Sequence, residues 1–263
     1  MCYFVFTMID TGIGKNNVIA NENVMKPVWI FRHGATEGAG YFAEYLDQHQ
    51  IPWRLIALDQ GEEVPLDPEP AAGLAFMGGA MSVNDDLVWI SRSVELIQQA
   101  VVQNRPVIGH CLGGQLLSRA LGGLVVRNPR PEIGWHPVRV IPGATAAAWL
   151  GDHGEFDVFE WHNETFTIPL GATQILVNSN CTNQAFVWGP HIAMQFHIEM
   201  TPDMVHSWCQ DWSHEVGLCQ DPALPQSIQT PQQMQENLEQ RIDTMRVIAR
   251  RIYDRWRQGL VVD

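Results

Sequence analysis

Short hydrophobic runs alternate with helix-periodic segments over the first half of the chain. The runs that we predict as buried strands are residues 28–31, 53–58, 73–77 and 106–110. Segments in which hydrophobic residues recur every three or four positions predict helices at residues 39–48, 87–102 and 113–121. Strands that alternate with helices indicate βαβ units. The pattern therefore predicts an α/β fold with a central, mostly parallel sheet and helices on both faces.

Beyond Gly123 the pattern changes to short strand candidates separated by turn residues. They are residues 124–126, 135–141, 156–162, 173–177, 185–188 and 191–196. Their close spacing predicts a small antiparallel extension of the sheet. Residues 201–212 resemble a helix, with Thr201 as the N-cap and Pro202 at the first helical position.

The C-terminal segment predicts a long amphipathic helix. It begins at Thr230 and Pro231, after a proline-containing linker at residues 221–229, and Gly259 is its predicted stop. Hydrophobic residues recur at helical spacing along it, at Met234, Leu238, Ile242, Met245, Ile248, Ile252 and Trp256. This spacing predicts that one face is buried against the domain or a partner chain.

The chain divides into three parts on this basis. Residues 1–24 have little periodicity, and we interpret them as an N-terminal extension, either a tag or a start codon placed too early. Residues 25–220 form the main domain, and residues 221–263 form the linker and the last helix.

Composition narrows the classes of protein. Of the 263 residues 46% are hydrophobic and 17% charged, which suits a globular domain with a large core. The net charge of −13 argues against a nucleic-acid partner, because phosphate binding needs a concentrated positive field. The one basic concentration, Arg246, Arg250, Arg251, Arg255 and Arg257, is interpreted as the solvated face of the last helix.

Two absences in the sequence bear on location. No hydrophobic run reaches the roughly 20 residues of a membrane span, so no membrane association is expected. The five cysteines are odd in number and scattered, without a CxxC pair. That pattern is not a disulfide framework, and it predicts a cytoplasmic protein.

The strongest local motif is a nucleophile elbow at residues 106–123. A hydrophobic strand runs into Gly109-His110-Cys111-Leu112-Gly113, and a helix of small residues follows. This is the G-x-nucleophile-x-G pattern, which places Cys111 at a strained strand-to-helix turn. The helix N-terminus favours a thiolate there, and the N–H of Leu112 lies where an oxyanion would form.

Two further segments supply the other parts of a catalytic site. His197 and Glu199 follow a strand at positions i and i+2, so their side chains leave on the same face as a base and the group that orients it. The Gly78-Gly79 loop follows another buried strand, and the N–H of Gly79 would be the second oxyanion donor.

Together these three motifs resemble the class I glutamine amidotransferase family, from about Pro27 to Trp212. The closest resemblance is to stand-alone proteins similar to the amidotransferase domain of GMP synthetase. It implies the flavodoxin-like fold of that family. It also implies attack of Cys111 on the side-chain amide of glutamine, proton transfer by His197, orientation of His197 by Glu199, and a γ-glutamyl thioester intermediate.

The resemblance also implies a substrate pocket and a partner. Gln115 and the Gly78 loop would contact glutamine, and Trp161 and His162 occupy the stretch where the family has a Ser-His pair that helps to hold it. No cofactor is required. The released ammonia would need a separate synthetase or acceptor protein, because the chain has no ATP-pyrophosphatase motif.

Departures from the family pattern affect the pocket more than the chemistry. Ile198 stands where the family usually has proline, Gly114 where it often has a larger residue, and His110 where it has an apolar one. The substrate is therefore less certain than the mechanism. A γ-glutamyl peptidase or hydrolase with the same triad is the main competing hypothesis.

Two hypotheses from different classes of protein are less favoured. One is a dienelactone-hydrolase-like enzyme, with Asp157 in place of Glu199, and the other is a non-catalytic binding protein. No paired Cys or His spacing indicates a metal, so no metal site is expected. His153 and His162, which flank an acidic strand, are interpreted as surface histidines.

Overall fold

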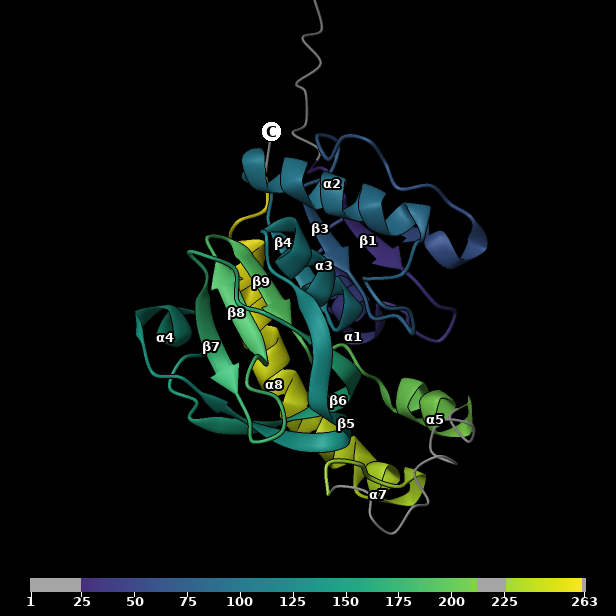
Figure 1. Ribbon diagram of the computed structural model, residues 1–263, viewed down its shortest axis with the longest axis vertical. Helices are drawn as coiled ribbons and strands as arrows, with labels where there is room; N and C mark the ends of the chain where they lie inside the picture. The colour runs from purple at the N-terminus through teal and green to yellow at the C-terminus, as the bar shows by residue number, and fades with distance from the viewer. Residues whose placement is uncertain (1–24, 212–225, 262–263) are drawn as a thin grey trace, which may run out of the picture.

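The computed structural model describes residues 25–211 and 226–261 (Figure 1). The predicted extension at residues 1–24 lies outside this range, as do residues 221–225 of the predicted linker and Trp212 at the end of a predicted helix.

Nine strands of the described residues form one mixed sheet, in the order β2-β1-β3-β4-β9-β8-β7-β5-β6. The strands are β1 Val28–Arg32, β2 Trp53–Ala57, β3 Gly73–Phe76, β4 Val107–His110, β5 Val125–Val140, β6 Glu155–Phe166, β7 Thr173–Val177, β8 Ala185–Trp188 and β9 His191–Met194. The pairs from β2 to β9 are parallel, and the pairs from β9 to β6 are antiparallel. The predicted α/β class, with a parallel centre and an antiparallel extension, is confirmed.

Helices cover both faces of this sheet (Figure 1). The helices are α1 Gly40–Gln48, α2 Val88–Val102, α3 Leu112–Ala120, α4 Ala144–Leu150, α5 Pro202–Asp211, α7 Pro231–Gln235 and α8 Leu238–Arg257, with a 3₁₀ turn at Leu58–Gln60. Buried residues of α1, α4 and α8 share one hydrophobic core, and those of α2 and α3 share the other. Strands β3, β4 and β9 lie between these layers, and every residue in them is buried, as expected for central parallel strands.

The last helix lies across the sheet rather than apart from it. All seven side chains of its predicted stripe are buried, with exposed fractions of 6% or less. On the opposite side, Arg250, Arg251, Arg255 and Arg257 are exposed, as predicted. Arg246 is half-buried, because its guanidinium lies 4.5 Å from the ring centre of Tyr41.

The predicted bounds of one strand and of the last helix are wrong, the first at two prolines and the second at an asparagine. The strands predicted at residues 124–126 and 135–141 are one strand, β5. Its pairing with β6 is irregular between Arg127 and Glu132, where Pro129 and Pro131 lack the N–H of a regular ladder. The last helix is divided into α7 and α8 at Asn237, which has a left-handed backbone (φ 54°).

Helix α4 was not predicted at all. It follows Pro142 and Gly143, is rich in alanine, and buries Trp149 and Leu150. At seven residues it is too short for hydrophobic periodicity to identify it. The helix starts predicted at Thr201 and Thr230 are confirmed. Thr201 Oγ1 accepts the N–H of Met204 at 3.2 Å, and Thr230 forms a capping box with Gln233.

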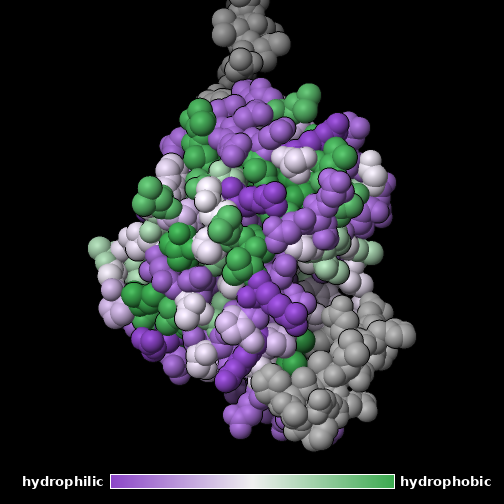
Figure 2. Space-filling model, in the orientation of Figure 1, coloured by the Kyte–Doolittle hydropathy of each residue, from purple (hydrophilic) through white to green (hydrophobic). Residues whose placement is uncertain are grey.

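The exposed surface mixes hydrophobic and hydrophilic residues. On the face drawn in Figure 2, the two kinds lie interspersed. No helix in the described part of the chain is both long and apolar enough to cross a membrane.

His191, at the start of β9, should make the fold sensitive to acid. Its Nδ1 accepts the N–H of Val107 at 3.1 Å, and burial lowers its pKa to about 4. As the pH falls below about 6.5, the imidazole becomes protonated in the unfolded chain, whereas in the folded chain it becomes protonated only near pH 4. The free energy of unfolding therefore decreases over that pH window. Between pH 7 and pH 5, urea denaturation should show that wild type loses about 2 kcal/mol more of its free energy of unfolding than His191→Asn does. The asparagine is a matched control because its side-chain oxygen can also accept the Val107 N–H. Equal losses in both proteins would contradict this role.

Candidate active site

The elbow at Cys111 has the strained geometry that its motif predicts. Cys111 follows β4 with φ 49° and ψ −109°, and α3 begins at the next residue, Leu112. The N–H of Cys111 donates to the carbonyl of Met194 in β9 at 2.9 Å, which ties the turn to the neighbouring strand. A Cβ on Gly113 would overlap the carbonyl of Phe76, and one on Gly114 would lie 2.5 Å from the oxygen of Met194. The glycines are required because β3 and β9 pass so close to α3.

His197 and Glu199 form a buried pair beside this turn. Nδ1 of His197 lies 2.6 Å from Oε1 of Glu199, and the two residues are 2% and 1% exposed. Cys111 is near enough to His197 to help raise the pKa of its ring. The predicted strand at residues 191–196 was too long. β9 ends at Met194, and His197 is held instead by its N–H, which donates to the carbonyl of Phe159 in β6 at 2.8 Å.

Electrostatics favours the charged form of this pair. Burial alone would lower the pKa of His197, but the carboxylate of Glu199 and the contact with Cys111 outweigh it and raise that pKa well above its usual value. Burial would raise the pKa of Glu199, yet the charge of His197 and the hydrogen bond to His197 hold it below its usual value. An imidazolium at this position can give a proton to a leaving group.

The Gly78-Gly79 loop lies against both His197 and the start of α3. A Cβ on Gly78 would come 2.7 Å from Cε1 of His197, and a Cβ on Gly79 would overlap the side chain of Leu112. Leu112 is the first residue of α3, so its N–H has no carbonyl one turn earlier to bind. The structure therefore brings together all the residues that the sequence predicted as nucleophile, base, orienting group and oxyanion donors.

His33, which sequence reasoning missed, fixes this loop. It follows β1 and is 3% exposed, and its Nδ1 donates to the carbonyl of Gly78 at 3.0 Å. Burial lowers its pKa to about 4, so the ring is neutral at pH 7. Its position after a central parallel strand, at the same sheet edge as the elbow, was the available signal.

Two glutamine side chains lie near the sulfur of Cys111, one in contact with it and one behind the first. Gln115, which the sequence predicted as substrate-binding, is 4% exposed, and its Nε2 lies 3.3 Å from Oε1 of Gln195 and 3.4 Å from the carbonyl of Glu164. Gln195 was not predicted. Its amide donates toward Sγ of Cys111 at 3.7 Å. Gln115 therefore reaches the nucleophile through Gln195.

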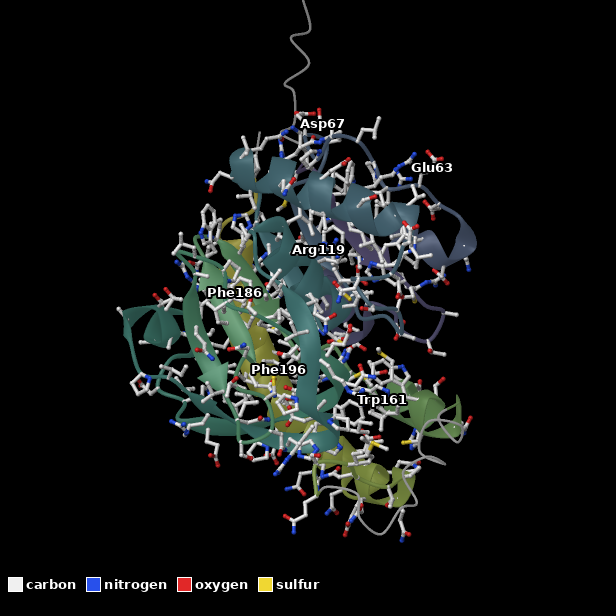
Figure 3. All side chains as sticks on the ribbon, viewed as in Figure 1. Glu63, Asp67, Arg119, Trp161, Phe186 and Phe196 are labelled. Atoms are coloured by element: carbon white, nitrogen blue, oxygen red, sulfur yellow. The ribbon has the colours of Figure 1, made fainter. Side chains whose placement is uncertain are left out.

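Trp161 forms an aromatic wall next to Cys111. The thiol of Cys111 donates to the carbonyl of Trp161 at 3.8 Å, and the indole packs edge-on against Trp208 of α5 at 5.2 Å between ring centres. Figure 3 shows Trp161 beside α5. Trp208 also meets the ring of His197 edge-on at 4.9 Å, and its Nε1 donates to the carbonyl of Thr36. Helix α5 thereby fixes the orientation of His197.

His162 has other partners than those expected. The interpretation of His162 as a surface histidine is wrong, because the residue is 6% exposed and its Nε2 lies 3.1 Å from Glu132 and 3.2 Å from Glu160. His153 is exposed, as expected. The side chain predicted to help bind substrate lies in a buried cluster with Glu132 and Glu160.

The position of Asp157 distinguishes two of the hydrolase hypotheses. A dienelactone-hydrolase-like enzyme would need Asp157 as the partner of His197, but Asp157 is exposed on β6 while His197 contacts Glu199. The geometry therefore favours the triad order of a class I amidotransferase.

Comparison with known proteins supports the same conclusion. Residues 44–210 match the model of the family described as glutamine amidotransferase class-I. The chain belongs to this family. Within it, the chain is 43% identical to a glutamine amidotransferase of Methylobacillus flagellatus. That crystal structure superposes with a TM-score of 0.88 and covers 91% of this chain and 97% of its own.

Two curated relatives are more distant in sequence. The glutamine amidotransferase-like protein YfeJ of Salmonella typhimurium is 27% identical over 81% of this chain and 94% of its own length. A glutamine-hydrolysing GMP synthase subunit of Saccharolobus solfataricus is 30% identical over 48% of this chain and 65% of its own length. The chain thus spans just under two thirds of the GMP synthase subunit that it matches.

Proposed function

We propose that the protein hydrolyses the side-chain amide of L-glutamine through a γ-glutamyl thioester on Cys111. The observation that carries this proposal is the convergence of an elbow cysteine at positive φ with a buried His197–Glu199 pair, in a chain of the class I amidotransferase family. Glutamate and ammonia are the products.

Each residue of the site has its own role in the proposed reaction. The thiol proton of Cys111 passes to His197, Sγ attacks the amide carbon, and the N–H groups of Gly79 and Leu112 bind the oxygen as it becomes negative. His197 gives its proton to the leaving ammonia and then takes one from the water that hydrolyses the thioester. Glu199 holds Nδ1 of His197, so that Nε2 faces the sulfur.

The substrate pocket is proposed around Gln115, the Gly78 loop and Trp161. Cys111 and His197 are 6% and 2% exposed, and the amide of Gln195 and the carbonyl of Trp161 both contact Sγ. Glutamine therefore reaches the sulfur only if these groups move aside. Movement of α5, which carries Trp208, would open the wall at Trp161 and release the ring of His197 at the same time.

The ammonia is proposed to serve a separate synthetase or acceptor protein in the cytoplasm. The relative from Saccharolobus solfataricus is named as one subunit of a GMP synthase, which supports a division of labour between chains. A partner that moves α5 would also explain why the free protein holds its nucleophile closed.

The test is release of ammonia and glutamate from L-glutamine by the purified chain, compared with glutathione and γ-glutamyl dipeptides. We expect glutamine to have a kcat/KM at least about tenfold above any γ-glutamyl peptide, because a peptide needs the carbonyl of Trp161 and the amide of Gln195 to move further aside than the unsubstituted amide of glutamine does. Gln115→Ala should raise KM with a smaller effect on kcat, because it removes contacts to the non-reacting end. A preference for γ-glutamyl peptides would instead make the protein a peptidase with the same triad.

A further inference from the structure

A second cluster of reactive side chains lies buried behind Trp161. It contains Glu132 of β5, Glu160 and His162 of β6, and Cys181 of the turn after β7. The exposed fractions of these residues range from 0% to 6%. A ligand atom from each of Glu132, His162 and Cys181 lies within 4.8 Å of the other two. Carboxylate, imidazole and thiol groups are the donors that zinc prefers in proteins.

The hydrogen bonds of His162 leave one nitrogen facing the cluster. Nδ1 lies 2.9 Å from the carbonyl of Glu164, which only accepts, so Nδ1 carries a proton. Nε2 then faces two carboxylate oxygens, at 3.1 Å on Glu132 and 3.2 Å on Glu160. One N–H on Nε2 can form a well-directed hydrogen bond with only one of them. A cation bound to Nε2 would satisfy both.

Glu160 is the member that most needs a further partner. It is 0% exposed, and within the described residues neither of its oxygens receives a well-aligned hydrogen bond. Glu132, by contrast, is well supported. Its Oε1 accepts the amides of Asn178 and Asn180, and its Oε2 accepts that of Gln184. Glu160 is thus a buried carboxylate whose ion pair among the described residues is with His162.

From this geometry we propose that Glu132, Glu160, His162 and Cys181 bind one divalent transition-metal ion, with zinc as the preferred ion. The separations between Nε2 and the two oxygens are close to the roughly 3.3 Å expected between ligand atoms around a tetrahedral ion with bonds of about 2.0–2.1 Å. With Cys181 bound as a thiolate, the two carboxylates and the sulfur supply three negative charges, which favours binding of a divalent cation. The bond from Nδ1 to the Glu164 carbonyl and the amides on Glu132 are the supports that metal ligands usually have.

The ion would stabilise the wall of the active site. His162 and Glu160 flank Trp161, whose carbonyl contacts Sγ of Cys111, and the carbonyl of Glu164 contacts both His162 and Gln115. The metal would therefore join β5, β6 and the turn at Asn178–Cys181 at the point where β6 meets the nucleophile. Its role is structural, since its four ligands do not include Cys111, His197 or Glu199.

The test is metal binding by the full chain after treatment with a chelator. Wild type should bind about one equivalent of Zn²⁺, with a rise in Tm, and Co²⁺ should give the near-ultraviolet absorption of a thiolate–cobalt bond. Cys181→Ser should lose that absorption and bind Zn²⁺ at least about tenfold more weakly. Glu160→Gln, which keeps the shape of the side chain, should weaken Zn²⁺ to a similar extent while its metal-free Tm stays near that of wild type.

Two matched thiol variants separate this site from others. Cys209→Ser alters another buried thiol, and Cys111→Ala removes the nucleophile. Both should retain the metal and the cobalt absorption. The proposal is overturned if wild type binds no Zn²⁺ at micromolar concentration, if Cys181→Ser and Glu160→Gln bind it as well as wild type does, or if Cys111→Ala abolishes binding.

Discussion

Cys111→Ala should lower the kcat for glutamine hydrolysis by at least about 10⁴-fold while leaving the fold intact. Without Sγ no thioester forms, and the remaining groups can act only on a water that has no place beside the substrate carbon. The fold should survive, because the change removes one buried atom and Cβ, which the backbone at φ 49° already accommodates, remains. Ammonia release and the Tm measured on the same preparation check both expectations.

The matched control is Cys209→Ala. Cys209 is also a buried free thiol, but it lies in α5, with its sulfur 4.0 Å from the carbonyl of Pro231. Its replacement should keep kcat within about twofold and reduce stability by about 1 kcal/mol, as expected for a small buried group. If the two variants lost activity equally, Cys111 would not be the nucleophile.

The sequence placed the candidate catalytic residues at positions that the structure brings together, because those positions follow from local rules. Glycines beside a nucleophile, a Gly-Gly loop after a buried strand, and a His-x-Glu pair all place functional groups at the ends of strands. In a parallel sheet, strand ends from distant segments meet at one edge. Thus Gly78, Cys111 and His197 converge although they are far apart in the chain.

The groups that support the site were harder to predict. His33, Gln195 and Trp208 contact Gly78, Cys111 and His197 through pairings that no local sequence pattern predicts. The same holds for the contact of Glu132 with His162, which depends on how β5 and β6 align across an irregular stretch. Two prolines in that stretch interrupt the alternation of hydrophobic and polar residues, so the pattern did not predict β5 as one continuous strand. Sequence reasoning consequently placed His162 on the surface.

His110 illustrates the same difficulty inside the elbow motif. The sequence identified it only as a departure from an apolar position. In the structure its Nε2 lies 3.8 Å from Oε2 of Glu199 and 3.4 Å from the hydroxyl of Tyr253 in α8. Burial lowers the pKa of His110, so the ring is neutral and polar rather than a second cation. The C-terminal helix therefore contributes to the surroundings of the catalytic carboxylate.

Glu199→Gln should lower kcat by about 10²- to 10⁴-fold with a smaller change in KM. The substitution keeps the size of the side chain and its ability to accept a hydrogen bond from Nδ1 of His197, but it removes the negative charge. That charge is the main influence that opposes burial and raises the pKa of His197. In the variant, burial dominates and the pKa of His197 falls, so the imidazolium beside Cys111 is lost at neutral pH.

The protonation of His197 can be followed directly by NMR of its ring nitrogens, with His197→Asn used for assignment. In wild type the ring should stay doubly protonated through neutral pH, and in Glu199→Gln it should lose its proton at a lower pH. The contribution of the His197–Glu199 pair to the free energy of unfolding should be complete below about pH 6.5 and should decline as the pH rises through the raised pKa of His197. Glu199→Gln should not show this decline. The same titration in both proteins would refute the role of Glu199. A double variant with Cys111→Ala should be no slower than Cys111→Ala alone, because Glu199 acts only through His197 on a nucleophile that is already absent.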